Sequence, residues 1–512
     1  MSMTKFSIAA LLVLPAATLA AAPTGGSTCD SLSRITLPHV AITSAQTVAS
    51  GAFTPPAASG PGRPNMALFQ GLPAFCRVMA TLTPSGDSDI KIEVWLPASG
   101  WNNDFQAIGN GGWNGTIGYG PLAEGVKKGF ATAATDTGHE GGSASFALGH
   151  PEKLTDFAYR AVHETTVASK ALIQNFYGSA PRYSYWNGCS TGGRQGLKEA
   201  QKYPADFDGI IAGAPANYQT HLHVWSIWVA QQVNKTPDSF LPPDKLAVLH
   251  KAVMAACDAN DGVKDGLIND PTRCHFDPKT IECKGEDLSN CLKPAQVAAV
   301  QAIYAGPRNS SGKEVFATFQ PGSELGWSIL AGKQAASVAS DTFTYIVYKN
   351  PAWDWKTMNL DSDVALLDKT EDGSIDAMDT NMKPFFAHNG KLLMYHGWSD
   401  QLIAPENSIH YYSSVVKNLG GAKKASNDVR LFMVPGMAHC GGGEGPNDFD
   451  KVAAIQQWVE QGKAPETMIA SHLDKTGIAD RTRPLCVYPK VARYNGTGST
   501  DDAANFTCAL PQ

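Results

Sequence analysis

The chain has 512 residues and the composition of an ordinary globular protein, with 41 Lys and Arg against 47 Asp and Glu and a net charge of −6. Because this length exceeds what one simple core needs, we expect a large domain with an elaboration. No basic stripe is present in the sequence, which argues against nucleic acid as the partner.

Residues 1–22 have the pattern of a secretory signal peptide. Lys5 supplies the positive charge, Phe6 to Leu14 form an apolar run too short to span a bilayer, and small residues follow at 18–22. An N-terminal membrane anchor is the alternative. Ten cysteines, an even number, agree with export and predict disulfides. We therefore expect a secreted protein, periplasmic if the source is a Gram-negative bacterium, with no membrane partner.

Strand and helix patterns alternate along the next two hundred residues. Residues 23–62 are rich in Ala, Pro, Ser and Gly and are interpreted as an irregular N-terminal arm. Period-two alternation predicts a strand at 90–94, and a helical pattern covers 156–177. Short strands are also expected at 105–108, 130–134, 183–187 and 209–213. This order predicts an α/β fold, with a mostly parallel sheet covered by helices on both faces.

The pentapeptide Gly188-Cys189-Ser190-Thr191-Gly192 is a G-x-S-x-G motif. An aromatic-rich strand precedes it, and strong helix formers follow from Gln195. Strand, sharp glycine-flanked turn and helix are the context of a nucleophile elbow, in which the serine hydroxyl is exposed at the end of the strand. An ordinary strand-to-helix turn is the alternative for the bare motif.

The α/β pattern stops near Ala214 and returns with strand signals at 391–395 and 429–434. Residues 214–384 are rich in Trp, Pro and Asp/Gly turns. We interpret this segment as an insertion that forms a lid, with residues 23–213 and 385–512 as the catalytic domain.

Within the insertion, Asp258, Asp261 and Asp265 bracket Gly262 and Gly266. Hard oxygen ligands on a tight loop suit Ca²⁺. The terminal bidentate Glu of an EF-hand is absent, and from spacing alone a solvated Asp/Gly turn is an equal alternative.

A serine nucleophile needs a base and a group that orients the base, in the chain order Ser, Asp or Glu, His. Asp400 follows the strand at 391–395 and His439 follows the strand at 429–434. His139 and His396 also follow strands and are the rival bases. Cys189 precedes the serine and Cys440 follows His439, so a disulfide between them would make Ser190 and His439 neighbours. Two unrelated structural cysteines are the alternative.

These residues resemble the CS-D-HC motif of the tannase and feruloyl esterase family, which comprises secreted α/β-hydrolases with a large lid. The resemblance rests on Gly188 to Gly196, Asp400 and His439-Cys440. Further segments that fit are 156–160, 207–209, 390–393 and 458–460. It implies Ser190 as nucleophile, Asp400 as orienting acid, His439 as base and a Cys189–Cys440 disulfide.

The same resemblance extends to the oxyanion donors, the metal and the other cysteines. The backbone N–H of Thr191 is one donor expected from the elbow, and the loop 109–112 supplies the second, with Gly112 favoured over Gly111. A plain turn is the alternative for that loop. The resemblance implies a structural Ca²⁺ held by side chains of Asp258, Asp261 and Asp265 and by carbonyls of Val263 and Leu267. It also implies the disulfides Cys29–Cys76, Cys257–Cys274, Cys283–Cys291 and Cys486–Cys508.

The sequence therefore predicts a serine carboxylesterase that cleaves esters of aromatic, hydroxycinnamic acids through an acyl-enzyme, with a free or polysaccharide-linked ester as substrate. A tannase and a mono(2-hydroxyethyl) terephthalate hydrolase are the alternatives within the family. A non-catalytic binding protein and a serine peptidase are the alternatives outside it. Five aromatic residues of the insertion either line the acid pocket or form the lid core: Trp225, Trp228, Phe343, Trp353 and Trp355.

Overall fold

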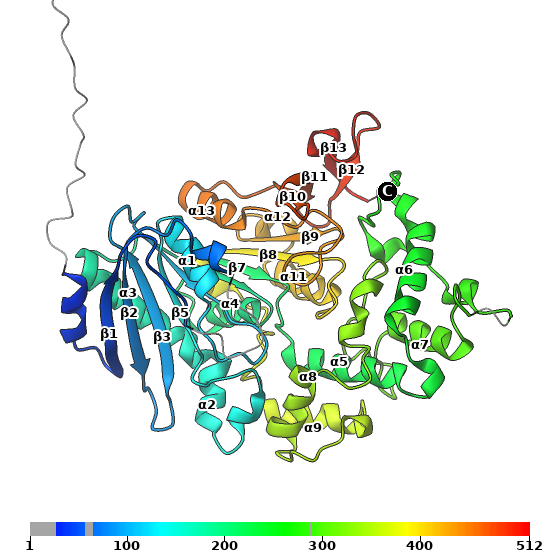
Figure 1. Cartoon of the computed structure of the whole chain (residues 1–512), viewed down its shortest axis with the longest axis horizontal. Helices are drawn as coiled ribbons and strands as arrows, with labels where there is room; N and C mark the ends of the chain where they lie inside the picture. The colour runs from blue at the N-terminus through cyan, green and yellow to red at the C-terminus, as the bar shows by residue number, and fades with distance from the viewer. Residues whose placement is uncertain (1–26, 57–64, 286–287, 512) are drawn as a thin grey trace, which may run out of the picture.

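The computed structural model describes residues 27–56, 65–285 and 288–511 (Figure 1). The predicted signal segment, residues 1–22, lies outside the described residues. Within them, no helix is both long and apolar enough to cross a bilayer.

A nine-stranded sheet forms the centre of the molecule, in the order β1-β2-β3-β5-β4-β6-β7-β8-β9. The pairs β1–β2, β2–β3 and β3–β5 are antiparallel, and every neighbouring pair from β5 across to β9 is parallel. The bounds are β1 (Val40–Val48), β2 (Phe75–Leu82), β3 (Ile90–Pro97), β4 (Asp104–Ile108), β5 (Ala131–Thr135), β6 (Tyr183–Cys189), β7 (Gly209–Gly213), β8 (Lys391–Gly397) and β9 (Val429–Val434). The predicted α/β class is confirmed.

The antiparallel edge corrects the interpretation of residues 23–62 as an irregular arm. Residues 40–48 form β1, which pairs along its length with β2, a strand that the sequence pattern did not indicate. Only Ala45 of β1 is buried. An edge strand that buries so few side chains lacks the apolar alternation by which strands are recognised, and its pairing with β2 determines its conformation.

Helices cover both faces of the sheet, and successive residues of each strand serve different cores. In β7, Ile210 packs into the core beneath α3, α4 and α11, whereas Ile211 packs into the core beneath α13. The helices of this domain are α1 (Tyr119–Lys127), α2 (Pro151–Thr155), α3 (Ala161–Tyr177), α4 (Thr191–Lys202), α11 (Glu406–Asn418), α12 (Ala422–Ala425) and α13 (Lys451–Gln461). The helix predicted at 156–177 is α3, preceded by a π-helical turn at Asp156–Arg160.

Residues 214–384 connect the adjacent strands β7 and β8 and pack beside the sheet (Figure 1). Their described residues form helices and turns around a separate hydrophobic core. The helices are α5 (Gln219–Val233), α6 (Pro243–Cys257), α7 (Pro294–Ala305), α8 (Ser337–Asp341), α9 (Ser362–Glu371) and α10 (Lys383–Ala387), which ends just beyond the predicted boundary. Trp225, Trp228, Phe343 and Trp355 are buried in this core and Trp353 packs against it. The sequence left two interpretations of these aromatic residues, pocket lining or lid core. The structure places them in the core of the insertion.

After α13 the chain forms two small hairpins, coloured orange to red in Figure 1. They pair β10 (Thr467–Leu473) with β11 (Ala479–Cys486) and β12 (Val491–Tyr494) with β13 (Phe506–Ala509). Five disulfides are present, Cys29–Cys76, Cys189–Cys440, Cys257–Cys274, Cys283–Cys291 and Cys486–Cys508. These are the pairs that the family resemblance implies.

Candidate active site

Ser190 occupies a sharp turn between β6 and α4. Its backbone has φ 63° and ψ −127°, a strained conformation for a residue with a side chain. A Cβ atom at Gly188 would lie 2.3 Å from the carbonyl oxygen of Gly192, so only glycine permits the turn to close this tightly. Ser190 is the N-cap residue of α4, yet its side chain makes no capping hydrogen bond. Among the described residues, its hydroxyl makes no hydrogen bond that would hold it away from a substrate.

Asp400 and His439 lie in the loops that follow β8 and β9, and the two side chains meet. His439 Nδ1 lies 2.8 Å from Asp400 Oδ2, and Gln401 Oε1 accepts a hydrogen bond from the backbone N–H of His439 at 3.1 Å. The Cys189–Cys440 disulfide places its two Cα atoms 5.9 Å apart. The elbow and the histidine loop, 251 residues apart in the chain, are thus covalently joined beside Ser190 and His439.

Among the described residues no direct hydrogen bond joins Ser190 to His439. Such bonds are commonly long before substrate binds and tighten in the reacting complex. His439 directs Nδ1 to the carboxylate, which leaves Nε2 as the nitrogen that can take a proton from a hydroxyl.

Asp400 is completely buried and has a full set of donors. Its Oδ1 accepts from the backbone N–H groups of Leu402 and Ile403, at 2.8 and 2.9 Å. Its Oδ2 faces His439 Nδ1 and His396 Nε2, the latter at 3.0 Å. Burial alone would raise the pKa of Asp400, but the charge of His439 and these hydrogen bonds hold it well below its usual range. Asp400 is therefore an anion in the folded protein.

Neither rival histidine occupies the position of the base. His139 lies after β5, where its Nε2 is 2.7 Å from the carbonyl oxygen of Trp113, and burial lowers its pKa. His396 is buried at the end of β8, behind Asp400. Of the three candidates, His439 combines contact with the acid, partial exposure and attachment to the elbow.

The glycine-rich loop 109–112 lies against the elbow. Thr191 Oγ1 donates to the carbonyl oxygen of Gly112 at 2.9 Å, and the backbone N–H of Gly192 donates to the carbonyl oxygen of Asn110 at 2.8 Å. These contacts place the peptide of Gly112 beside that of Thr191. Gly111 is one residue earlier in the same loop.

Gln195 and Thr135 hold this loop in place through hydrogen bonds that the sequence did not predict. Gln195 Oε1 accepts from the backbone N–H of Asn110 at 3.0 Å, and Gln195 Nε2 donates to Asn110 Oδ1 at 3.1 Å. Asn110 Nδ2 also donates to the carbonyl oxygen of Thr135 at 2.8 Å. Gln195 lies in the nonapeptide that resembles the family motif, which was the available signal.

The aspartates of the predicted calcium loop follow α6. Asp258 Oδ1 accepts from the backbone N–H groups of Asp265 and Gly266, and Asp265 Oδ2 pairs with Arg483 Nη2 at 2.7 Å. Burial, with the neighbouring carboxylates of Asp265 and Asp258, raises the pKa of Asp261 to about 6. The three carboxylates thus lie near enough to affect one another's charge, and one of them is paired with an arginine.

The donor chemistry of this loop fits a hard cation. Asn269 donates to Asp261 Oδ2, yet its own Oδ1 is buried without a hydrogen-bond partner among the described residues. Leu267 lies against Gly436, in the loop that leads to His439. The predicted ligand set, with the carbonyls of Val263 and Leu267, therefore lies directly behind the histidine loop.

The structure also brings together a second group of possible metal ligands, which the sequence did not predict: His163, Glu199 and Asp206. Within the part of the chain that the structure describes, it is the one group of three whose ligand atoms all lie within 4.8 Å of one another. Lys170 Nζ donates to the carbonyl oxygen of Asp206, and burial together with Asp206 raises the pKa of Glu199 well above its usual value. An ammonium group and a proton on Glu199 therefore balance the charges here without a metal.

Two segments of the insertion approach the candidate site. Val338 of α8 lies 3.6 Å from the position that a Cβ of Gly112 would take. Gly326 packs against Gln401, which accepts a hydrogen bond from the backbone of His439. Leu325 and Ile329, in the same short helix as Gly326, are each 50% exposed, unlike the buried aromatic residues.

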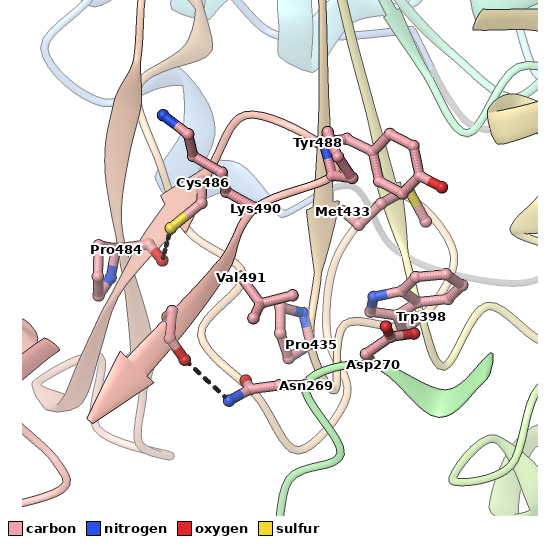
Figure 2. A pocket seen from close by; sticks show the side chains of 12 residues that line it. Asn269, Asp270, Trp398, Met433, Pro435, Pro484, Cys486, Tyr488, Lys490 and Val491 are labelled. Carbon is pink, nitrogen blue, oxygen red and sulfur yellow. Dashed lines mark hydrogen bonds between the residues drawn. The ribbon is translucent and has the colours of Figure 1, made fainter. Parts of the chain in front are cut away.

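A hollow in the described surface lies outside the proposed triad. It holds about 380 Å³ of space, open solvent included, and Asn269, Trp398, Pro435, Tyr488 and Val491 are among its lining (Figure 2). None of Ser190, Asp400 and His439 lines it. The hollow lies between the insertion, the loop after β8 and the C-terminal hairpins, and it contains no member of the proposed triad.

Comparisons with known proteins identify the family. The family described as tannase and feruloyl esterase matches residues 76–509. The chain is 37% identical to an uncharacterized esterase of Xanthomonas campestris, over 94% of this chain and 91% of that protein. It is 36% identical to a probable feruloyl esterase B-2 of Neosartorya fischeri, over 99% and 100%. The crystal structure of feruloyl esterase B from Aspergillus oryzae superposes with a TM-score of 0.88 at 32% identity, covering 94% of this chain and 99% of that one.

Proposed function

The chain belongs to the tannase and feruloyl esterase family and is a carboxylic ester hydrolase with an α/β-hydrolase fold; from that premise we propose that Ser190 is its nucleophile, His439 its general base and Asp400 the group that orients the histidine. The single observation that supports this assignment best is the Cys189–Cys440 disulfide, because it joins the elbow to a histidine already bonded to a buried aspartate.

The reaction proceeds in two halves. Ser190 Oγ bonds to the ester carbonyl carbon while His439 Nε2 takes the hydroxyl proton, and Asp400 stabilises the imidazolium that results. The C–O bond to the alcohol then breaks, and His439 returns the proton to the leaving alkoxide. Water, deprotonated by His439, attacks the acyl-enzyme and releases the acid and the free serine.

The developing oxyanion needs donors that are fixed before the reaction. The backbone N–H groups of Thr191 and Gly112 are proposed for this role, with Gly111 as the neighbouring choice. The hydrogen bond from Thr191 Oγ1 to the Gly112 carbonyl oxygen holds the two peptides together. Gln195 Oε1 holds the same loop by accepting from the backbone N–H of Asn110.

We propose that the acyl group is a hydroxycinnamate or a related phenolic acid. Support comes from the family and from relatives named feruloyl esterase B. We propose Val338, Leu325 and Ile329 as apolar surfaces for a flat ring, because they belong to the two segments of the insertion that contact Gly112 and Gln401. The family name also covers tannases, so gallate esters are the second candidate.

Ser190→Ala tests the mechanism, and an ester panel tests the substrate. Ser190→Ala should remove hydrolysis of methyl ferulate while the melting temperature stays that of the wild type. Activity of this variant within a few-fold of the wild type would contradict the assignment.

For the wild type, kcat/KM should be highest for methyl ferulate or methyl caffeate, followed by methyl gallate, a terephthalate monoester and a long-chain p-nitrophenyl ester. A preference for the long-chain ester would overturn the substrate proposal alone.

We further propose that the loop 258–267 holds a structural Ca²⁺ and that the protein is exported. Two observations support the calcium site. Neighbouring carboxylates raise the pKa of Asp261, and the buried Oδ1 of Asn269 has no hydrogen-bond partner among the described residues. Five disulfides, with the signal-like pattern of residues 1–22, support export. Ca²⁺ would supply charge balance for the loop and take no part in ester cleavage.

A further inference from the structure

His396 is a fully buried histidine that contacts the acid of the proposed triad at the same carboxylate oxygen as His439. Its Nε2 lies 3.0 Å from Asp400 Oδ2 and 3.1 Å from the carbonyl oxygen of Ile403, and its Nδ1 lies 2.7 Å from Ser408 Oγ. We propose that His396 is a positioning residue, which holds the Asp400 carboxylate in place for His439. This inference rests on the function proposed above.

The contacts of His396 determine where its hydrogen lies. Both partners of Nε2 are oxygen acceptors, so Nε2 carries a hydrogen and shares it between Asp400 and Ile403. The hydroxyl of Ser408, on α11, can donate to Nδ1. The ring is thereby held at both nitrogens, with the Nε2 hydrogen directed at the Asp400 carboxylate.

The donor from His396 completes the surroundings of Asp400. A carboxylate has about four lone-pair sites, and Leu402 and Ile403 occupy two of them through Oδ1. On Oδ2, His396 occupies the third and leaves one site, which faces His439. Without His396 the carboxylate could rotate about its Cβ–Cγ bond, and His439 would lose its fixed partner.

The same contact affects the charge that Asp400 presents to His439. A donor to Oδ2 disperses part of the carboxylate charge, so less of that charge acts on an imidazolium at His439. Removal of the His396 donor would strengthen this charge. The main ionisable groups that act on Asp400 are His439 and His396 themselves.

Two amide variants separate this role from simple packing. Gln at position 396 places an amide donor near the position of Nε2, whereas the shorter Asn can reach toward Ser408 but not toward Asp400. We expect H396N to lower kcat for methyl ferulate by about 10- to 100-fold with KM nearly unchanged, and H396Q to stay within a few-fold of the wild type. The acid limb of kcat/KM should move to higher pH in H396N, by about half a unit, and stay in place in H396Q.

The rate of labelling of Ser190 by a serine-directed phosphonate, measured against pH, gives the same test without any particular ester. His163→Asn is the matched control, since it removes another histidine–carboxylate contact, with Asp206, which follows the end of α4 opposite to Ser190. It should leave labelling and its acid limb unchanged.

Each outcome has one meaning. Equal kcat and equal acid limbs in H396N and H396Q would overturn the role of His396, including the case in which both lose only thermal stability. A wild-type protein that the phosphonate does not label would instead contradict the proposed function. If H396N labels slowly, with a raised acid limb, while H396Q labels like the wild type, the role is established.

Discussion

Two buried carboxylates show how the surroundings of a residue determine its charge. Asp400 is enclosed by two backbone N–H groups and two histidines, and its pKa lies well below the usual range. Glu199 is equally buried, but neither of its oxygens receives a hydrogen bond among the described residues, and its pKa is raised. Burial acts in the same direction on both. Donors therefore decide that Asp400 is an anion that can stabilise the imidazolium of His439.

Asp400→Asn should nearly abolish turnover while preserving the fold. The amide has the shape of the carboxylate but lacks its charge. Its NH₂ group can also replace Oδ2, the oxygen that faces the N–H of His439, and an NH₂ group cannot accept that hydrogen bond. We expect kcat to fall by about 10⁴-fold, with little change in KM. Steady-state kinetics on methyl ferulate, with a melting curve for each protein, provide the measurement. A loss of less than tenfold would exclude Asp400 as the orienting acid.

At the scale of elements, the site consists of three strand ends and their loops. β6 ends at the elbow, β8 ends before the acid loop and β9 ends before the histidine loop. Parallel strands bring their carboxyl ends to one edge, so residues 190, 400 and 439 meet there. The Cys189–Cys440 disulfide connects the first of these loops to the third.

Loss of this disulfide should affect activity more than loss of another one. We expect the double variant Cys189→Ala with Cys440→Ala to lower kcat by more than tenfold, because the histidine loop is no longer tied to the elbow. By chain entropy alone, closing so long a loop is also worth about 5.5 kcal/mol in the unfolding free energy. Cys283→Ala with Cys291→Ala, which opens a short disulfide loop of the insertion, is the control. Equal kcat values for the two double variants would contradict a role of the bond in alignment.

The calcium loop is the element whose occupancy should be most visible in stability. Chelator should lower the melting temperature of the wild type, and Asp261→Ala should melt lower and lose that response. Because the pKa of Asp261 is raised to about 6, protons should compete with the metal as the pH falls through 6. The effect of chelator should therefore be smaller at pH 5 than at pH 7.5. Absence of bound calcium by elemental analysis of the purified protein would reject the site.

The elements that the sequence predicted are those with a strong local pattern. The strands at 183–187, 391–395 and 429–434 combine apolar runs with turn signals, and the disulfide pairing followed from two cysteines beside two catalytic candidates. β1 was missed because it buries one side chain, and its strand conformation depends on β2. The support from Gln195 to Asn110 was missed because it joins residues 85 positions apart. No local pattern reports such a contact.

In the whole molecule, the insertion is fastened to the sheet domain at several polar contacts. Buried Arg194 and Lys198 of α4 donate to backbone carbonyls between Gly373 and Asp376, and Trp113 donates to Val338. These contacts join the elbow helix and the end of the glycine-rich loop 109–112 to the insertion. The position of the proposed lid is thereby coupled to both segments.

One further contact between the two parts depends on pH. His250 of α6 lies 2.8 Å from Glu324 of the insertion and 3.2 Å from Glu444, four residues after Cys440. Burial alone would lower the pKa of His250, but the two carboxylates raise it to about 9. Tyr304 also bonds to Glu324, through the other carboxylate oxygen. The imidazolium of His250 therefore links the insertion to the histidine loop.

A raised pKa in the folded state means that His250 stabilises the protein fully below its unfolded pKa of about 6.5, and that this stability is lost as the pH rises through 9. The shift corresponds to roughly 3 kcal/mol of unfolding free energy. We expect the melting temperature of the wild type to fall between pH 6.5 and pH 9.5, and that of His250→Gln to start lower and fall less over the same range. His388→Gln, at an exposed position after α10, is the control and should follow the wild type. Parallel melting curves for His250→Gln and the wild type across this range would show that the histidine does not hold the two parts together through its charge.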